Sequence, residues 1–203
     1  MALMQQDRAL RFSLFSDSEM ALLEPEQILH PVEREMYKTM SISRKADFLK
    51  GRYAVKSILN DSPASQMSHV LIAAASSGKP YAPSDPKLFC SISHSDGYAA
   101  AAISMQAAIG IDVEKIKARH PALLRYISDD DLGDLAQQYS RDIFPIVVWT
   151  IKEAAAKADT NIFPLREYRI FYKKGITVKR GDNYWNVTLV VLPFHICAIA
   201  IAQ

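Results

Sequence analysis

The pattern of hydrophobic and polar positions predicts a β-strand at residues 109–115. Branched apolar residues alternate there with Gly110, Asp112 and Glu114. Side chains change faces at every residue of a strand, so the two carboxylates point the same way. Cα atoms of residues i and i+2 lie about 6.5–7 Å apart, so an oxygen from each carboxylate can reach one hard cation. The other interpretation is a strand end that runs into solvent, where charged residues are common.

A helix is predicted at residues 144–158, where apolar residues recur at helical spacing. A second row on this helix, at steps of four, holds Trp149, Glu153 and Lys157. An exposed pair of Glu153 and Lys157 would contribute only about 0.3–0.5 kcal/mol. A large aromatic residue is seldom left in water, so Trp149 indicates that this face is covered and that the two charged residues are partly enclosed.

Residues 31–60 are also predicted to be helical, with an inward apolar stripe that includes Val55. Lys45, Arg52 and Lys56 fall beside this stripe at steps of seven and four. They form either the solvated flank of an amphipathic helix or a phosphate site, and the pattern alone leaves both interpretations open.

Further candidate site residues lie in a turn and at the ends of a predicted strand and a predicted helix. Gly78 and Pro80 form a tight turn that presents Lys79, but the second glycine and the Lys-Ser/Thr ending of a Walker-type loop are missing. His94 lies near the end of a strand predicted at residues 88–95 and is either a structural histidine or a ligand. The acidic run at residues 129–131 begins a helix predicted within residues 121–140, where the helix dipole favours negative charge.

The remaining apolar runs predict strands on both sides of these elements. They are Leu10–Phe15, Val70–Ala75, Tyr98–Ser104, Tyr168–Tyr172, Ile176–Lys179, Tyr184–Leu192 and Phe194–Ala202. The last four predict an antiparallel meander, and Met105 with Gln106 predicts a hairpin that leads back into the carboxylate strand. Two of these strands are rich in alanine, which hints at two similar halves.

Composition narrows the function classes. The chain has 203 residues, 49% hydrophobic and 23% charged, enough to bury a core as one domain or two close-packed halves. A net charge of +2 does not indicate nucleic-acid binding by overall field. We find neither a signal peptide nor a membrane-spanning run, and we expect a cytoplasmic protein. Cys90 and Cys197 lie in apolar runs and are predicted to be buried, reduced thiols.

Two segments in this order resemble the signature of the 4'-phosphopantetheinyl transferases of the larger, single-chain type. The first is residues 110–114, Gly-Ile-Asp-Val-Glu, and the second is residues 149–157, Trp-Thr-Ile-Lys-Glu-Ala-Ala-Ala-Lys. Residues 91–95, 77–80 and 48–52 are similar to further pieces of the family pattern. The resemblance covers approximately residues 30 to 160.

The resemblance implies an α+β fold of two similar halves related by a pseudo-twofold, with coenzyme A in the cleft between them. The expected halves are residues 1–108, on the adenosine and phosphate side, and residues 109–203, with the metal strand, the catalytic helix and the strand meander. The implied reaction transfers the 4'-phosphopantetheine arm of coenzyme A to a serine of an acyl or peptidyl carrier protein, and adenosine 3',5'-bisphosphate is released.

The resemblance also implies roles for single residues. Asp112, Glu114 and Glu153 would hold Mg²⁺ on the pyrophosphate, and Lys157 would neutralise the departing phosphate. The base would be Glu153 or Asp131. The adenosine end and its 3'-phosphate would be bound by a basic and polar set: Arg52, Lys79, His94, Lys45 and Ser93.

Two positions depart from the family pattern, and two rival functions remain. Asp131 stands where some members carry Glu, and residues 158–162 lack the glycine usual after the helix. The rivals are a non-catalytic module that binds coenzyme A or a carrier protein, and an unrelated Mg²⁺-dependent phosphohydrolase. We expect coenzyme A and an apo carrier protein as partners of a monomer, with no nucleic acid and no membrane.

Overall fold

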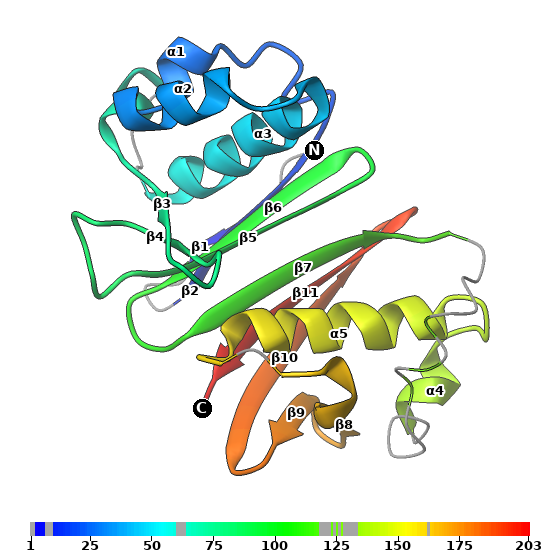
Figure 1. Cartoon of the computed structure of the whole chain (residues 1–203). Helices are drawn as coiled ribbons and strands as arrows, with labels where there is room; N and C mark the ends of the chain where they lie inside the picture. Colours follow the sequence, from blue (N-terminus) through cyan, green and yellow to red (C-terminus); the bar gives the residue numbers. More distant parts are fainter. Residues whose placement is uncertain are drawn as a thin grey trace. The chain divides into compact units, whose positions relative to one another are not determined.

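The computed structural model of the chain describes residues 3–6, 10–59, 64–117, 123, 125, 127, 134–161 and 163–203. The chain forms two compact units, Met1–Gln106 and Ala107–Gln203. Each unit combines an antiparallel sheet with one long helix (Figure 1).

The first unit is built on a six-stranded sheet of order β1-β2-β6-β5-β4-β3. The strands are β1 (Leu3–Gln6), β2 (Leu10–Ser16), β3 (Ala73–Ala74), β4 (Pro80–Tyr81), β5 (Phe89–Ser95) and β6 (Tyr98–Ser104). The helices are α1 (Pro25–Ile28), α2 (Pro31–Lys38) and α3 (Ile42–Leu59). Val55 of α3 packs in one core with Ala99 and Ala101 of β6. The small alanine side chains of β6 let the helix lie close to the sheet.

The second unit contains a five-stranded sheet of order β7-β11-β10-β9-β8. The strands are β7 (Ile109–Lys115), β8 (Arg169–Tyr172), β9 (Ile176–Arg180), β10 (Asn183–Val191) and β11 (His195–Ala202). The helices are α4 (Asp134–Gln138) and α5 (Phe144–Ala158). Val147, Val148 and Ile151 of α5 are buried in its core.

The two units share one topology. In unit 1 the chain runs from β2 into α3, and the last strand, β6, pairs with β2. In unit 2 it runs from β7 into α5, and the last strand, β11, pairs with β7. The orders β2-β6-β5-β4-β3 and β7-β11-β10-β9-β8 therefore correspond strand by strand. The predicted α+β fold with two similar halves is confirmed, and the two alanine-rich strands are equivalent members of it.

One predicted pairing was wrong, and two boundaries differ. β6 pairs with β2 and β5, and β7 pairs with β11, so Met105 and Gln106 link two sheets and do not close a hairpin. A short turn between two apolar strands has the same local pattern in either case. The helix predicted at residues 31–60 is two helices, and the strand predicted at 70–75 shrinks to Ala73–Ala74, where it pairs with β4.

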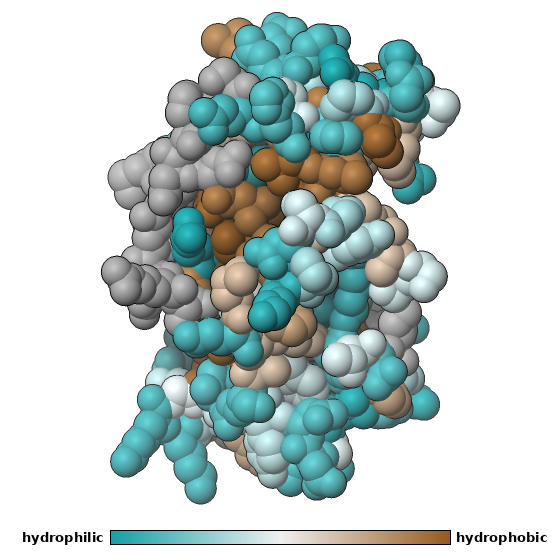
Figure 2. Space-filling view, turned by 90° about the vertical axis from the view of Figure 1, so that its left-hand side faces the viewer, coloured by the Kyte–Doolittle hydropathy of each residue, from teal (hydrophilic) through white to brown (hydrophobic). Residues whose placement is uncertain are grey.

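Hydrophilic side chains cover most of one face of the molecule (Figure 2), and both cysteines lie in its interior. On the face in Figure 2 hydrophilic side chains predominate, with an apolar area in the upper half of the view. Within the described residues, no helix has the length and apolar character needed to cross a membrane. Cys90 and Cys197 are buried free thiols, as predicted.

Candidate active site

Helix α5 lies directly on the backbone of β7, and Gly110 makes this contact possible. A Cβ atom at residue 110 would lie 1.9 Å from the carbonyl oxygen of Ala154 and 2.6 Å from the backbone nitrogen of Ala158. No real side chain fits at such distances. Glycine on the strand and alanines on the helix therefore set how close the two elements come.

This close contact brings the carboxylates of β7 to the polar row of α5. Lys157 Nζ donates a hydrogen bond of 2.7 Å to Asp112 Oδ1, in an ion pair whose side chains are 31% and 5% exposed. Trp149 Nε1 donates to Glu114 Oε1 over 3.1 Å. The covered helix face predicted from Trp149 is thus confirmed. The surface-pair alternative is wrong, because the carboxylate that Lys157 contacts belongs to the neighbouring strand.

Glu153 lies on the same face of α5, one helical turn before Lys157, and is half-buried. Burial raises the pKa of its carboxyl group, the charges of Asp112 and Glu114 raise it further, and Lys157 opposes them. Three carboxylates thus act on one another across β7 and α5. A carboxylate with a raised pKa is a better proton acceptor near neutral pH than an ordinary one.

The donor types of this cluster suit a hard divalent cation, since carboxylate oxygens are the preferred ligands of Mg²⁺ and three like charges side by side favour a counter-ion. Among the residues that the structure describes, no three His, Cys, Asp or Glu side chains converge as they would around a metal ion. Lys157 and Trp149 contact Asp112 and Glu114 instead. The metal assignment therefore depends on donor chemistry and not on a preformed cluster.

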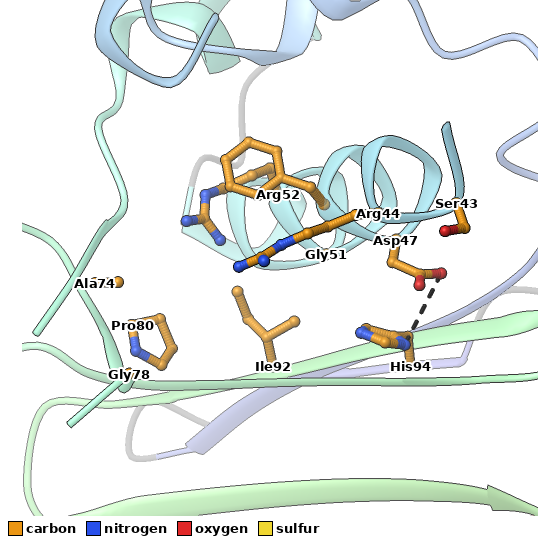
Figure 3. A pocket seen from close by; sticks show the side chains of 11 residues that line it. Ser43, Arg44, Asp47, Gly51, Arg52, Ala74, Gly78, Pro80, Ile92 and His94 are labelled. Carbon is orange, nitrogen blue, oxygen red and sulfur yellow. Dashed lines mark ion pairs between the residues drawn. The ribbon is translucent and has the colours of Figure 1, made fainter. Parts of the chain in front are cut away.

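A second candidate site lies wholly in unit 1. A cavity of about 400 Å³ is lined mainly by α3, the turn before β4, and β5. Its lining residues are Ser43, Arg44, Asp47, Phe48, Gly51, Arg52, Ala74, Gly78, Pro80, Ile92 and His94. In Figure 3 the Arg44 side chain extends along the cavity above Ile92, toward Ala74 and Pro80. At the other end His94 Nδ1 lies 3.9 Å from Asp47 Oδ1.

The structure brings together only part of the predicted phosphate-binding set. Arg52 and His94 line the cavity. Lys79 sits in the turn between two lining residues, while Lys45 lies over the ring of Tyr37, 5.4 Å from its centroid. Ser93 is buried and is not among the lining residues, because its side chain alternates with those of Ile92 and His94 along β5. Asp131 lies outside the described residues.

Arg44 and Glu33 are charged residues in or next to this site that were not predicted from the sequence. Arg44 lines the cavity with Phe48 and Arg52, at steps of four along α3, and this row is a signal that the sequence does contain. Glu33 is buried and pairs with both Arg52 and Lys56. Lys56 itself is fully buried, so the solvated-flank interpretation is wrong for it.

Comparison with known families places this half of the chain. Residues 32–104 match the family model of the 4'-phosphopantetheinyl transferase N-terminal domain. Unit 1 is thus similar to the N-terminal domain of the 4'-phosphopantetheinyl transferase family. The family predicted from the sequence is confirmed, and the match covers every residue that lines the unit 1 cavity. A search of curated proteins gave no match.

The segment after α5, which lacks the glycine typical of the transferases, is held by a buried carboxylate. Asp159, 2% exposed, accepts hydrogen bonds from Arg180 Nε over 2.7 Å and from the Tyr168 hydroxyl over 3.0 Å. The Arg180 guanidinium also lies over the Phe163 ring, 3.5 Å from its centroid. Arg180 of β9 thus fixes the chain just beyond Lys157 by charge and stacking.

Proposed function

We propose that the protein transfers the 4'-phosphopantetheine arm of coenzyme A to a serine of an acyl or peptidyl carrier protein. The observation that carries the proposal is the arrangement of β7 against α5, where Asp112 and Glu114 contact Lys157 and Trp149 and influence Glu153. These residues come from the two segments whose pattern is typical of the family, and the N-terminal unit supports the same family independently.

In this reaction the serine oxygen forms a bond to the phosphorus that carries the pantetheine arm, and the bond to the bridging oxygen of the pyrophosphate breaks. Adenosine 3',5'-bisphosphate leaves with the electron pair. Glu153 would accept the hydroxyl proton, which its raised pKa favours. Asp131, outside the described residues, is the other candidate base. Lys157 would stabilise the charge that grows on the departing phosphate.

Asp112, Glu114 and Glu153 would hold a Mg²⁺ ion, which would supply a positive charge next to the pyrophosphate oxygens. Lys157 would then exchange its contact with Asp112 for one with a phosphate, since both are anionic partners of comparable strength. In unit 1, Arg44, Arg52 and His94 would bind the adenosine end through its 3'-phosphate.

Intact-mass spectrometry tests the proposal. The protein is incubated with coenzyme A, Mg²⁺ and a panel of apo carrier proteins, and a carrier variant whose acceptor serine is replaced by alanine serves as the control. Mass gain of the arm on the parent carrier alone supports transfer. Coenzyme A binding without mass gain would mean a non-catalytic module, and release of phosphate without a modified carrier would mean a phosphohydrolase.

A further inference from the structure

Glu33 is a buried carboxylate of unit 1 that accepts several hydrogen bonds. Its side chain is 1% exposed, and each of its oxygens accepts from two donors. Oε1 accepts from Arg52 Nε over 2.8 Å and from the Ile72 backbone over 3.1 Å. Oε2 accepts from the His30 backbone over 2.9 Å and from Lys56 Nζ. One residue of α2 thus contacts α3 and the segment that leads to β3.

The charges in this cluster do not balance. Glu33 contributes one negative charge, while Arg52 and Lys56 contribute two positive charges, and all three side chains are at most 10% exposed. Burying a cation is costly unless an anion accompanies it. The cluster therefore has an excess of one positive charge, and Arg52 is the member that reaches the cavity.

The orientation of Arg52 is fixed on two sides. Its Nε donates to Glu33, and its guanidinium lies 4.3 Å from the centroid of the Phe48 ring. A guanidinium has five N–H donors in a rigid plane, so holding Nε also fixes the direction of the two terminal nitrogens. Within the described part of the chain, those terminal nitrogens donate no hydrogen bond to protein, and Arg52 lines the cavity beside Arg44.

We propose that Glu33 is a positioning residue that holds Arg52 by its Nε so that the terminal nitrogens face the cavity, ready to bind a phosphate monoester. The proposal rests on the proposed function, in which that group is the 3'-phosphate of coenzyme A. Glu33 does not touch the ligand. Its negative charge permits Arg52 to be buried, and its hydrogen bond to Nε orients the terminal N–H donors of Arg52 toward the cavity.

The test compares binding of coenzyme A and dephospho-coenzyme A, which lacks the 3'-phosphate, by calorimetry on the full chain. Glu33→Asp keeps the negative charge but shortens the side chain by one methylene. The carboxylate therefore moves away from Arg52, while the electric field at the cavity stays nearly the same. We expect the preference for coenzyme A to fall by about tenfold or more, the size of one charge-assisted hydrogen bond. Binding of dephospho-coenzyme A should stay close to that of the parent.

Glu35→Asp is the matched control, because Glu35 lies on the same helix with a side chain that is 72% exposed and should leave the preference unchanged. If Glu33→Asp does not fold, Arg52→Lys takes its place. It keeps the cation, but a single ammonium group cannot hold Glu33 and present a planar fork to the phosphate, so the preference should fall in the same way.

The outcomes separate the two proposals. A parent that binds neither ligand, or both equally, overturns the proposed ligand and the role of Glu33 with it. A parent that prefers coenzyme A while the folded variant loses stability but keeps the full preference leaves the proposed function in place and overturns the positioning role alone.

Discussion

The contact at Gly110 gives the sharpest prediction about the active site. In Gly110→Ala the new Cβ would have to move about 1.5 Å away from the Ala154 oxygen to reach an ordinary contact of 3.4 Å. The atoms that it meets belong to the helix backbone, which cannot rotate out of the way. The whole of α5 must therefore shift, although Val147, Val148 and Ile151 hold it in the core.

The expected loss follows from this displacement. Overpacking a well-packed core costs about 1–3 kcal/mol, and the strain here acts along backbone, so we expect about 3 kcal/mol. With a denaturant slope of about 1–3 kcal/mol per M of urea, the midpoint should fall by about 1–3 M. The shift should also separate Lys157 from Asp112, so transfer activity should fall together with stability.

Tryptophan fluorescence reports the loss of stability in unit 2, where the substitution lies. The chain has two tryptophans, Trp149 in α5 and Trp185 in β10, and both belong to unit 2. Urea titrations followed by emission therefore report unfolding of that unit. Gly175→Ala is the control, because its new Cβ would meet no atom within 4 Å. A Gly110→Ala midpoint within about 0.3 M of the control would refute the close-contact argument.

Three further predictions follow from charge and burial. Lys157→Met should lower kcat by about 100-fold while the exposed Lys38→Met does not, and a kcat within about threefold of the parent would return Lys157 to a structural role. Burial acts to raise the pKa of Asp159, but hydrogen bonds, chiefly from Arg180, hold it below its usual range. The contribution of ionised Asp159 to the free energy of unfolding is therefore fully present above about pH 4 and is lost as the pH falls below it. The urea midpoints of the parent and of Asp159→Asn should converge in acid. Midpoints that stay equally far apart would contradict this reasoning. Burial raises the pKa of Cys90 and Cys197 to about 12, so a disulfide reagent at pH 8 should modify both thiols only after unfolding, and rapid reaction of the folded chain would contradict their burial.

Local patterns were sufficient to predict most of the fold. The alternation of β7, the stripe of α5 and the four strands of the meander were located to within one or two residues. The pairing partners of β6 and β7 were not predicted, because pairing depends on which strands lie side by side. A short connection between two apolar strands has the same sequence pattern whether it joins strands of one sheet or of two. β1 was missed because its four residues, Leu-Met-Gln-Gln, gain their structure only by pairing with β2.

The candidate site shows the same limit at the scale of single side chains. Spacing placed Glu153 and Lys157 on one helix face, but the partner of Lys157 depends on how α5 sits on β7, which the contact at Gly110 decides. In α3, one residue corresponds to about 100° of rotation, and this separates Arg44 in the cavity from Lys45 over Tyr37. Sequence spacing predicted which residues of α3 share a face of the helix, but not which of those faces lines the cavity.

The two units solve the contact between helix and sheet in opposite ways, and this difference matches their different sites. In unit 2 the glycine lies on the strand, so α5 approaches the backbone of β7 and its long side chains reach the carboxylates. In unit 1 the glycine lies on the helix: a Cβ at Gly51 would come 2.9 Å from Cγ2 of Ile92 on β5, and both residues line the cavity. A missing side chain on the helix leaves space above the strand, and Arg44 and Arg52 border that space. One topology thus places strand carboxylates against a helix lysine where the strand carries the glycine, and leaves an open cavity with two arginines where the helix carries it.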